Sequence, residues 1–228
     1  MTTTALPRPR TSSAPLSAAP ARRAHRLLVA AVALVALTGG LVAGRAADDG
    51  IVRVDDAVDI GFARDMKVHH AQAVAMSAHV HRRSEDPELS FLALDIITTQ
   101  QGQIGIMSGW LDLWGHTQSK VGAAMTWMGD EHAGSMPGMA TDEEVAALGT
   151  LPVPQMEEQY LRLMIRHHWG AVPMAEHAAE EASSPEVSRL AKGMEQGQTA
   201  EVDLMQHMLA ARGLAPEHPQ HAGHAQHG

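Results

Sequence analysis

Residues 62–80 read FARDMKVHHAQAVAMSAHV, and residues 160–178 read YLRLMIRHHWGAVPMAEHA. The second segment repeats the first at an offset of 98 residues, and the match continues without a gap to residue 111, with 16 of 50 positions identical. Methionine and histidine are concentrated among the shared positions. Such self-similarity at a constant offset indicates the duplication of one structural unit.

Each copy predicts a hairpin of two helices. In the first copy the spacing of one set of positions alternates between four and three, which places them along one face of a helix. These positions are Phe62, Met66, His69, Ala73, Met76 and Val80. Pro87 and Pro185 follow this helix in the two copies and suit the first turn of a second helix. Two hairpins of this length can bury their stripes against each other, so the predicted fold is all-α, a four-helix bundle.

The chain divides into five predicted segments. Residues 1–46 combine a group of arginines with an apolar run from 27 to about 44, which is typical of a signal peptide, although a retained membrane anchor is equally open. Either interpretation exports the rest of the chain, because the arginine cluster stays in the cytoplasm. Residues 47–114 and 155–213 are the two hairpins. Between them, residues 115–154 form a Met-rich crossover loop with a short helix, whose capping box is Thr141 with Glu144. Residues 214–228 are predicted to be a disordered, His-rich tail.

The composition excludes several classes of site. The chain has 15 histidines, 14 methionines and no cysteine, so disulfides, cysteine nucleophiles and thiolate metal sites are ruled out. After residue 46 there are 11 basic and 26 acidic residues, a formal charge of −15. Such a surface argues against nucleic acid as a partner and favours cations. A membrane contact is expected only through the possible anchor, and no protein partner is indicated.

The repeated motif predicts a metal site. Met66 and His69 lie one turn apart on the same helix face, and His70 lies at the edge of that face. Thioethers with imidazoles suit Cu(I), imidazoles can also hold Cu(II), and zinc would normally bring cysteine or a carboxylate. The predicted metal ligands are Met66, His69, His70, Met76, Met107, Met164, His167, His168, Met174 and Met205.

If the hairpins pair symmetrically, we expect Met66, His69, Met164 and His167 to converge in the bundle interior, with Met107 and Met205 reaching the same layer. Gln100 and Gln198 could orient an imidazole as outer partners of the metal. The competing interpretation is that the methionines only fill the core.

Three further features leave alternatives open. Asp59 and Glu157 match at the same offset and are either helix-terminal carboxylates or oxygen ligands. In the loop, either copper capture or an ordered plug with Trp127 explains the methionines, which are Met125, Met128, Met136 and Met139 around His132. The tail histidines recur every third residue and could bind Cu(II), Ni(II) or Zn(II) loosely, or have no function; they are His218, His221, His224 and His227.

The motif Met66-x-x-His69-His70-x-x-Ala73-x-x-Met76, repeated from Met164 to Met174, resembles the hallmark of the domain of unknown function 305 family, over about residues 55–212. The resemblance implies a ferritin-like helical bundle. It also implies that copper binding is to be expected, since some members are periplasmic or extracellular copper-binding proteins linked to copper resistance. For many members no activity is established.

The favoured function is that of an exported copper-binding protein, extracellular, at the cell surface or periplasmic, that sequesters or delivers copper or confers resistance to it. The alternatives are a metal-dependent redox enzyme on a ferritin-like bundle and a non-catalytic structural or partner-binding bundle. An enzyme is less favoured, because no catalytic triad or phosphate-binding loop is present and Met replaces the Glu of the di-iron Glu-x-x-His pair. No catalytic residue is therefore assigned.

Overall fold

The computed structural model describes residues 54, 56–119, 122–129, 132–134 and 136–218. All of them belong to one compact unit, residues 51–228. The predicted signal or anchor at 1–46 and most of the predicted tail lie outside the described residues. Within the described part of the chain, no helix is long and apolar enough to cross a bilayer.

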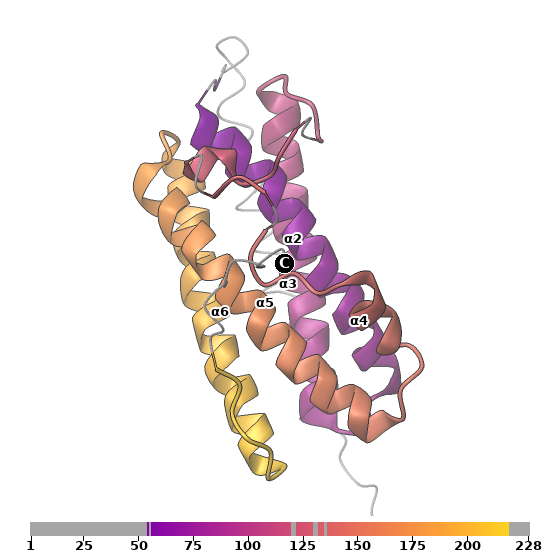
Figure 1. The fold of residues 1–228 in the computed structure, drawn as a ribbon. Helices are drawn as coiled ribbons and strands as arrows, with labels where there is room; N and C mark the ends of the chain where they lie inside the picture. Colours follow the sequence, from indigo (N-terminus) through magenta and orange to yellow (C-terminus); the bar gives the residue numbers. More distant parts are fainter. Residues whose placement is uncertain (1–53, 55, 120–121, 130–131, 135, 219–228) are drawn as a thin grey trace, which may run out of the picture. The chain divides into compact units, whose positions relative to one another are not determined.

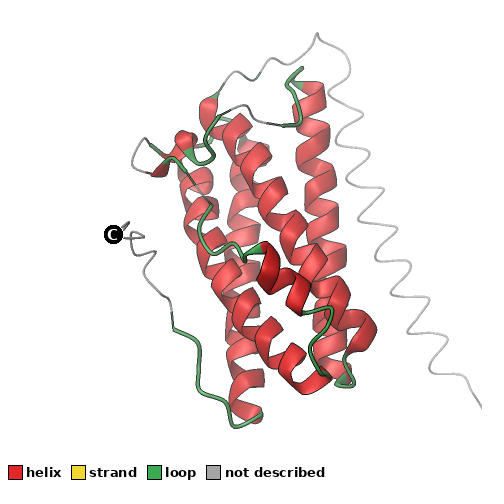
Figure 2. Ribbon diagram, turned by 45° about the vertical axis from the view of Figure 1, so that its right-hand side comes forward, coloured by secondary structure: helices red, strands yellow, loops and turns green. Residues whose placement is uncertain are grey.

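Four long helices make up the bundle (Figures 1 and 2). They are α2 (Ala57–Arg83), α3 (Pro87–Leu113), α5 (Val153–Glu181) and α6 (Pro185–Ala211). The connection between the hairpins contains the short helices η1 (Thr126–Met128) and α4 (Asp142–Ala147). No strand occurs among the described residues. The all-α bundle of two helical hairpins predicted from the repeat is confirmed.

The helix starts follow from local side-chain chemistry. The Asp86 carboxylate accepts hydrogen bonds from the first backbone N–H groups of α3, and Pro87 takes the first helical position. At the equivalent turn, Ser184 caps α6 ahead of Pro185. The capping box predicted for Thr141 and Glu144 is present at the start of α4. The repeat therefore encodes the turns of the hairpins as well as their helices.

The bundle core consists of two separate apolar clusters. The methionines of the first cluster include Met76, Met164 and Met205, and those of the second include Met66, Met107 and Met174. Residues late in α2 thus pack near residues early in α5, and residues early in α2 pack near residues late in α5. These two helices therefore run antiparallel. The offset of 98 converts each of these methionine triplets into the other, which gives the core an approximate twofold symmetry.

The crossover loop breaks that symmetry by packing over α2 and α5. Asp65, which is buried, accepts hydrogen bonds from the Met125 backbone N–H at 2.7 Å and from the Trp127 indole N–H at 2.9 Å. The Trp127 ring lies so close to Gly61 that a Cβ there would come within 2.4 Å of it. The loop is anchored by specific contacts, which supports the interpretation that it plugs the bundle.

Candidate metal centre

Polar side chains cross the bundle at the midpoints of all four long helices, between the two apolar clusters. We call this set the polar layer, and it comprises His69, His70, Gln100, Gln103, His167, His168, Gln198 and Glu201. All four histidines are fully buried. His69 and His167 meet at the centre, where their ring centroids are 3.8 Å apart.

The two central histidines each donate a hydrogen bond to a backbone carbonyl. His69 Nε2 lies 3.0 Å from the Pro137 oxygen in the crossover loop, and His167 Nε2 lies 3.1 Å from the His69 oxygen. A carbonyl only accepts, so Nε2 carries the proton in both rings. Their Nδ1 atoms, which then hold a lone pair, are buried and have no hydrogen-bond partner.

The two outer histidines have the same arrangement with different acceptors. His70 Nε2 lies 2.7 Å from the Gln103 amide oxygen, and His168 Nε2 lies 2.6 Å from a carboxylate oxygen of Glu201. The Nδ1 atoms of these rings are also buried without a partner. An unpaired buried acceptor is costly. An imidazole held through one nitrogen and free at the other is the usual arrangement of a metal-ligating histidine.

Burial favours the neutral form of His69, His70 and His167. Removal from water lowers the pKa of His69 to about 4, and the loop carbonyl of Pro137 offsets only part of that effect. Burial lowers the pKa of His70 to about 3, with a further contribution from the neighbouring His69. The pKa of His167 is also well below its usual value, first because of burial and then because of His69. A neutral imidazole is the form that binds a metal ion.

The prediction that Gln100 and Gln198 orient an imidazole is wrong for this structure. Both amides are buried, at 3% and 5% exposure, and neither their oxygen nor their nitrogen has a hydrogen-bond partner. Gln103 and Glu201, one turn further along α3 and α6, hold the histidines instead. The sequence signal for these two residues was the same offset of 98. This signal was weaker because the two equivalent residues are not identical: Gln103 in the first copy corresponds to Glu201 in the second.

The six predicted methionine ligands are fully buried but do not converge in one layer. Met66 precedes His69 by one turn, and Met164 precedes His167 by one turn. Because α2 and α5 are antiparallel, these two methionines lie on opposite sides of the central rings, in separate apolar clusters. No group of three or more His, Asp or Glu side chains with metal-binding geometry occurs among the described residues. A metal in the polar layer would therefore need thioether ligands, amide ligands or a rotation of the imidazoles.

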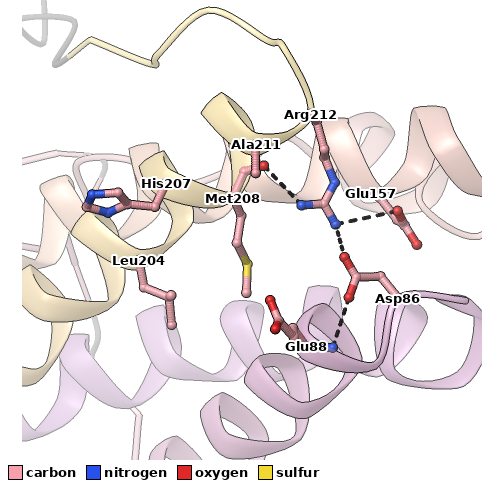
Figure 3. Close-up of a pocket in the computed structure, with 8 residues that line it drawn as sticks. All are labelled: Asp86, Glu88, Glu157, Leu204, His207, Met208, Ala211 and Arg212. Carbon is pink, nitrogen blue, oxygen red and sulfur yellow. Dashed lines mark hydrogen bonds and ion pairs between the residues drawn. The ribbon is translucent and has the colours of Figure 1, made fainter.

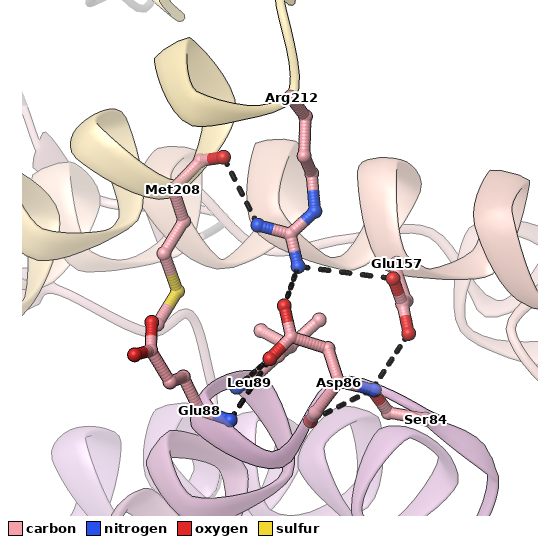
Figure 4. Close-up of polar contacts among 7 residues, drawn as sticks. All are labelled: Ser84, Asp86, Glu88, Leu89, Glu157, Met208 and Arg212. Carbon is pink, nitrogen blue, oxygen red and sulfur yellow. Dashed lines mark hydrogen bonds and ion pairs between the residues drawn. The ribbon is translucent and has the colours of Figure 1, made fainter.

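Asp59 and Glu157 bind the turn of the opposite hairpin. Asp59 is fully buried and accepts from the Ser184 backbone N–H at 3.2 Å, and burial raises the pKa of its carboxyl group. Glu157 accepts from the Ser84 hydroxyl at 2.6 Å and lies 3.7 Å from Arg212 (Figure 4). These contacts place both carboxylates at the ends of the bundle and give no support to a role as oxygen ligands.

An open pocket of about 440 Å³ lies beside Arg212, at the end of α6 (Figure 3). Arg212 forms an ion pair with Asp86 there and donates to the Met208 carbonyl oxygen at 3.0 Å. The lining residues include none from the polar layer. This pocket is thus distinct from the buried histidines.

Two solved structures are similar over most of the described part. The first is a protein of Streptomyces coelicolor that carries a domain of unknown function 305 and is thought to be secreted. It is 48% identical to this chain, with a TM-score of 0.68, and the match covers 72% of this chain and 99% of that one. A fragment with this domain from Deinococcus radiodurans is 38% identical, with a TM-score of 0.57 over 68% and 96% of the two chains.

A third solved relative is CopM, whose Cu(I)-bound form is 27% identical with a TM-score of 0.55, over 68% of this chain and 96% of that one. CopM has also been solved with Cu(II) and with silver. An uncharacterized protein of Acanthamoeba polyphaga mimivirus is 39% identical over 54 residues, which are 24% of this chain and 36% of that protein. This chain therefore spans only about a third of the viral relative.

The profile described as Domain of unknown function (DUF305) matches residues 59–209. That range includes all four long helices except the ends of α2 and α6 and contains the whole polar layer. The chain therefore belongs to the domain of unknown function 305 family, as the repeated Met-x-x-His-His motif indicates.

Proposed function

We propose that this protein binds copper ions outside the cytoplasm, in order to sequester or deliver them, and that the polar layer holds the metal. One observation carries the proposal: four buried, proton-donating imidazoles each keep an unpaired Nδ1 atom inside the bundle. Leaving four such atoms without a partner costs stability, and a bound cation would satisfy them.

The surrounding side chains favour copper over other metals. The predicted methionine ligands flank the polar layer on both sides, within the two apolar clusters. Thioether sulfur with imidazole nitrogen is a soft donor set that suits Cu(I), and the imidazoles also suit Cu(II). The similarity to CopM, solved with Cu(I), Cu(II) and silver, points to the same class of ion.

The charge of the chain favours a cation as its cargo, and one relative supports an exported role. After residue 46 the formal charge is −15, which attracts cations over the distance set by ionic strength. The Streptomyces coelicolor relative is thought to be secreted. Copper is the cargo in this proposal, so no reaction at the metal is required.

The test is a chelator-competition titration with Cu(I) and with Cu(II). The four tail histidines are first replaced by alanine, because they can bind metal by themselves. In that background H69Q/H167Q removes the two central imidazoles, and H81Q/H207Q removes two exposed ones as the matched control. We expect the first variant to lose copper affinity and the control to keep it. Equal affinity in the two variants would refute an interior site.

A stability measurement gives an independent readout. A ligand that binds only the folded protein at about 100 times its dissociation constant should raise the free energy of unfolding by about 2.7 kcal/mol. We expect this gain in the tail-substituted protein and in the control variant. Its absence in both would indicate that the bundle is purely structural.

A further inference from the structure

The polar layer takes four residues from each repeat, and we call these two sets its halves. The halves differ at one pair of equivalent positions. Gln103 in the first repeat corresponds to Glu201 in the second at the offset of 98. Each is the acceptor for the outer histidine of its own repeat, at nearly the same distance, 2.7 Å from His70 Nε2 and 2.6 Å from His168 Nε2. The geometry is thus conserved between the halves while the charge of the acceptor is not.

A carboxylate is not required to hold the outer ring. Gln103 shows that a neutral amide oxygen at this position is sufficient to hold the ring. The Glu201 side chain is only 19% exposed, and its partner His168 is fully buried. Partial burial of a carboxylate costs more than burial of an amide. The two acceptors therefore have nearly equal geometry and different charge, and that charge acts on whatever the imidazole binds.

A carboxylate partner changes what the imidazole can bind. By accepting the Nε2 proton strongly it increases the electron density on Nδ1, which makes that atom a better ligand. Its negative charge also attracts a metal ion in proportion to the charge of the ion, and the effect is strong away from water. Both effects favour a divalent ion more than a monovalent one.

We propose that the duplicated site is functionally unequal: the His168–Glu201 half prefers Cu(II), the His70–Gln103 half prefers Cu(I), and Glu201 is the positioning residue that sets this preference. The inference rests on the proposed function, since it assumes that the polar layer binds copper. It adds that one small bundle can accept both oxidation states because its two halves have diverged at a single pair of outer residues.

The experiment exchanges the two acceptors in the full chain with its tail histidines replaced by alanine. E201Q gives the second half the acceptor of the first, and we expect Cu(II) affinity to fall about 10- to 100-fold while Cu(I) affinity changes several times less. Q103E introduces a second carboxylate, and we expect Cu(II) affinity to rise. Because each substitution retains an oxygen acceptor, the hydrogen bond to the imidazole is preserved in both variants.

The double exchange Q103E/E201Q locates the preference. In the parent protein, substoichiometric Cu(II) should broaden the NMR signals of the His168 ring before those of His70. In the double exchange the order should reverse, with the overall Cu(II) affinity restored. A merely structural Glu201 would not move the broadening from one ring to the other.

The outcomes separate the two proposals. If the tail-substituted parent binds neither ion, the proposed function is wrong. If it binds both ions but E201Q weakens them equally, or if His168 is still broadened first in the double exchange, the inequality of the halves is refuted and the copper function stands. Melting temperatures of all three variants show whether any loss reflects unfolding.

Discussion

Acidification should destabilise the metal-free protein through its buried histidines. His69 and His70 have folded pKa values of about 4 and about 3, against 6.5 for an exposed imidazole. Between these limits the unfolded chain binds protons that the folded protein does not, so the free energy of unfolding rises with pH. The stability contributed by neutral burial is therefore present above pH 6.5 and lost progressively as the pH falls towards 4.

The magnitude follows from the two pKa values. Between pH 7 and pH 5 each of the two histidines should cost the folded state about 2 kcal/mol, which is about 4 kcal/mol together. His167, whose pKa is also lowered, acts in the same direction. A typical domain is stable by about 5–15 kcal/mol, so the metal-free protein should be close to unfolding at about pH 5.

The assay is denaturant unfolding of the metal-free protein at several pH values, followed by circular dichroism. Near pH 5.5 each buried histidine should add about 1.2 kcal/mol per pH unit to the slope of stability against pH. H69Q/H70Q should lower that slope by about 2.4 kcal/mol per pH unit. The exposed pair removed in H81Q/H207Q provides the control. An unchanged slope in H69Q/H70Q would show that these imidazoles are not buried in the neutral form.

Two further predictions concern the crossover loop. G170A places a Cβ about 2.1 Å from the Pro137 carbonyl oxygen and should lower the free energy of unfolding by about 1–3 kcal/mol, because it displaces the loop. The control G102A has open space around its Cβ and should be neutral or stabilising in the same denaturant assay. Equal effects of the two substitutions would contradict the close packing of the loop. D65A leaves the indole N–H of Trp127 and one backbone N–H without an acceptor, and should cost about 2–4 kcal/mol with a red shift in tryptophan fluorescence. A variant with parental stability and emission would show that this carboxylate does not hold the loop.

The sequence by itself was enough to determine the hairpins. Local rules decide where the helices begin, as at Asp86 with Pro87, and helical periodicity places Met66 and His69 on one face. Both depend only on residues within a turn or two of each other. The offset of 98 then implies that the two hairpins share one plan, and this is sufficient to predict an all-α bundle.

Only the tertiary structure decided how the motif residues meet. Because α2 and α5 run antiparallel, Met66 and Met164 separate while His69 and His167 come into contact. His70, predicted at the edge of the stripe, is fully buried because α3 covers that flank.

The loop and the acceptors are also tertiary features. The Pro137 carbonyl oxygen accepts a hydrogen bond from His69 Nε2, which lies 68 residues away in the sequence. No local pattern encodes this contact. The same holds for the two acceptors 33 residues from their histidines, Gln103 and Glu201. Helix propensity and periodicity act over a few residues, whereas the protonated nitrogen of each imidazole is selected by partners that only the packed bundle brings within reach.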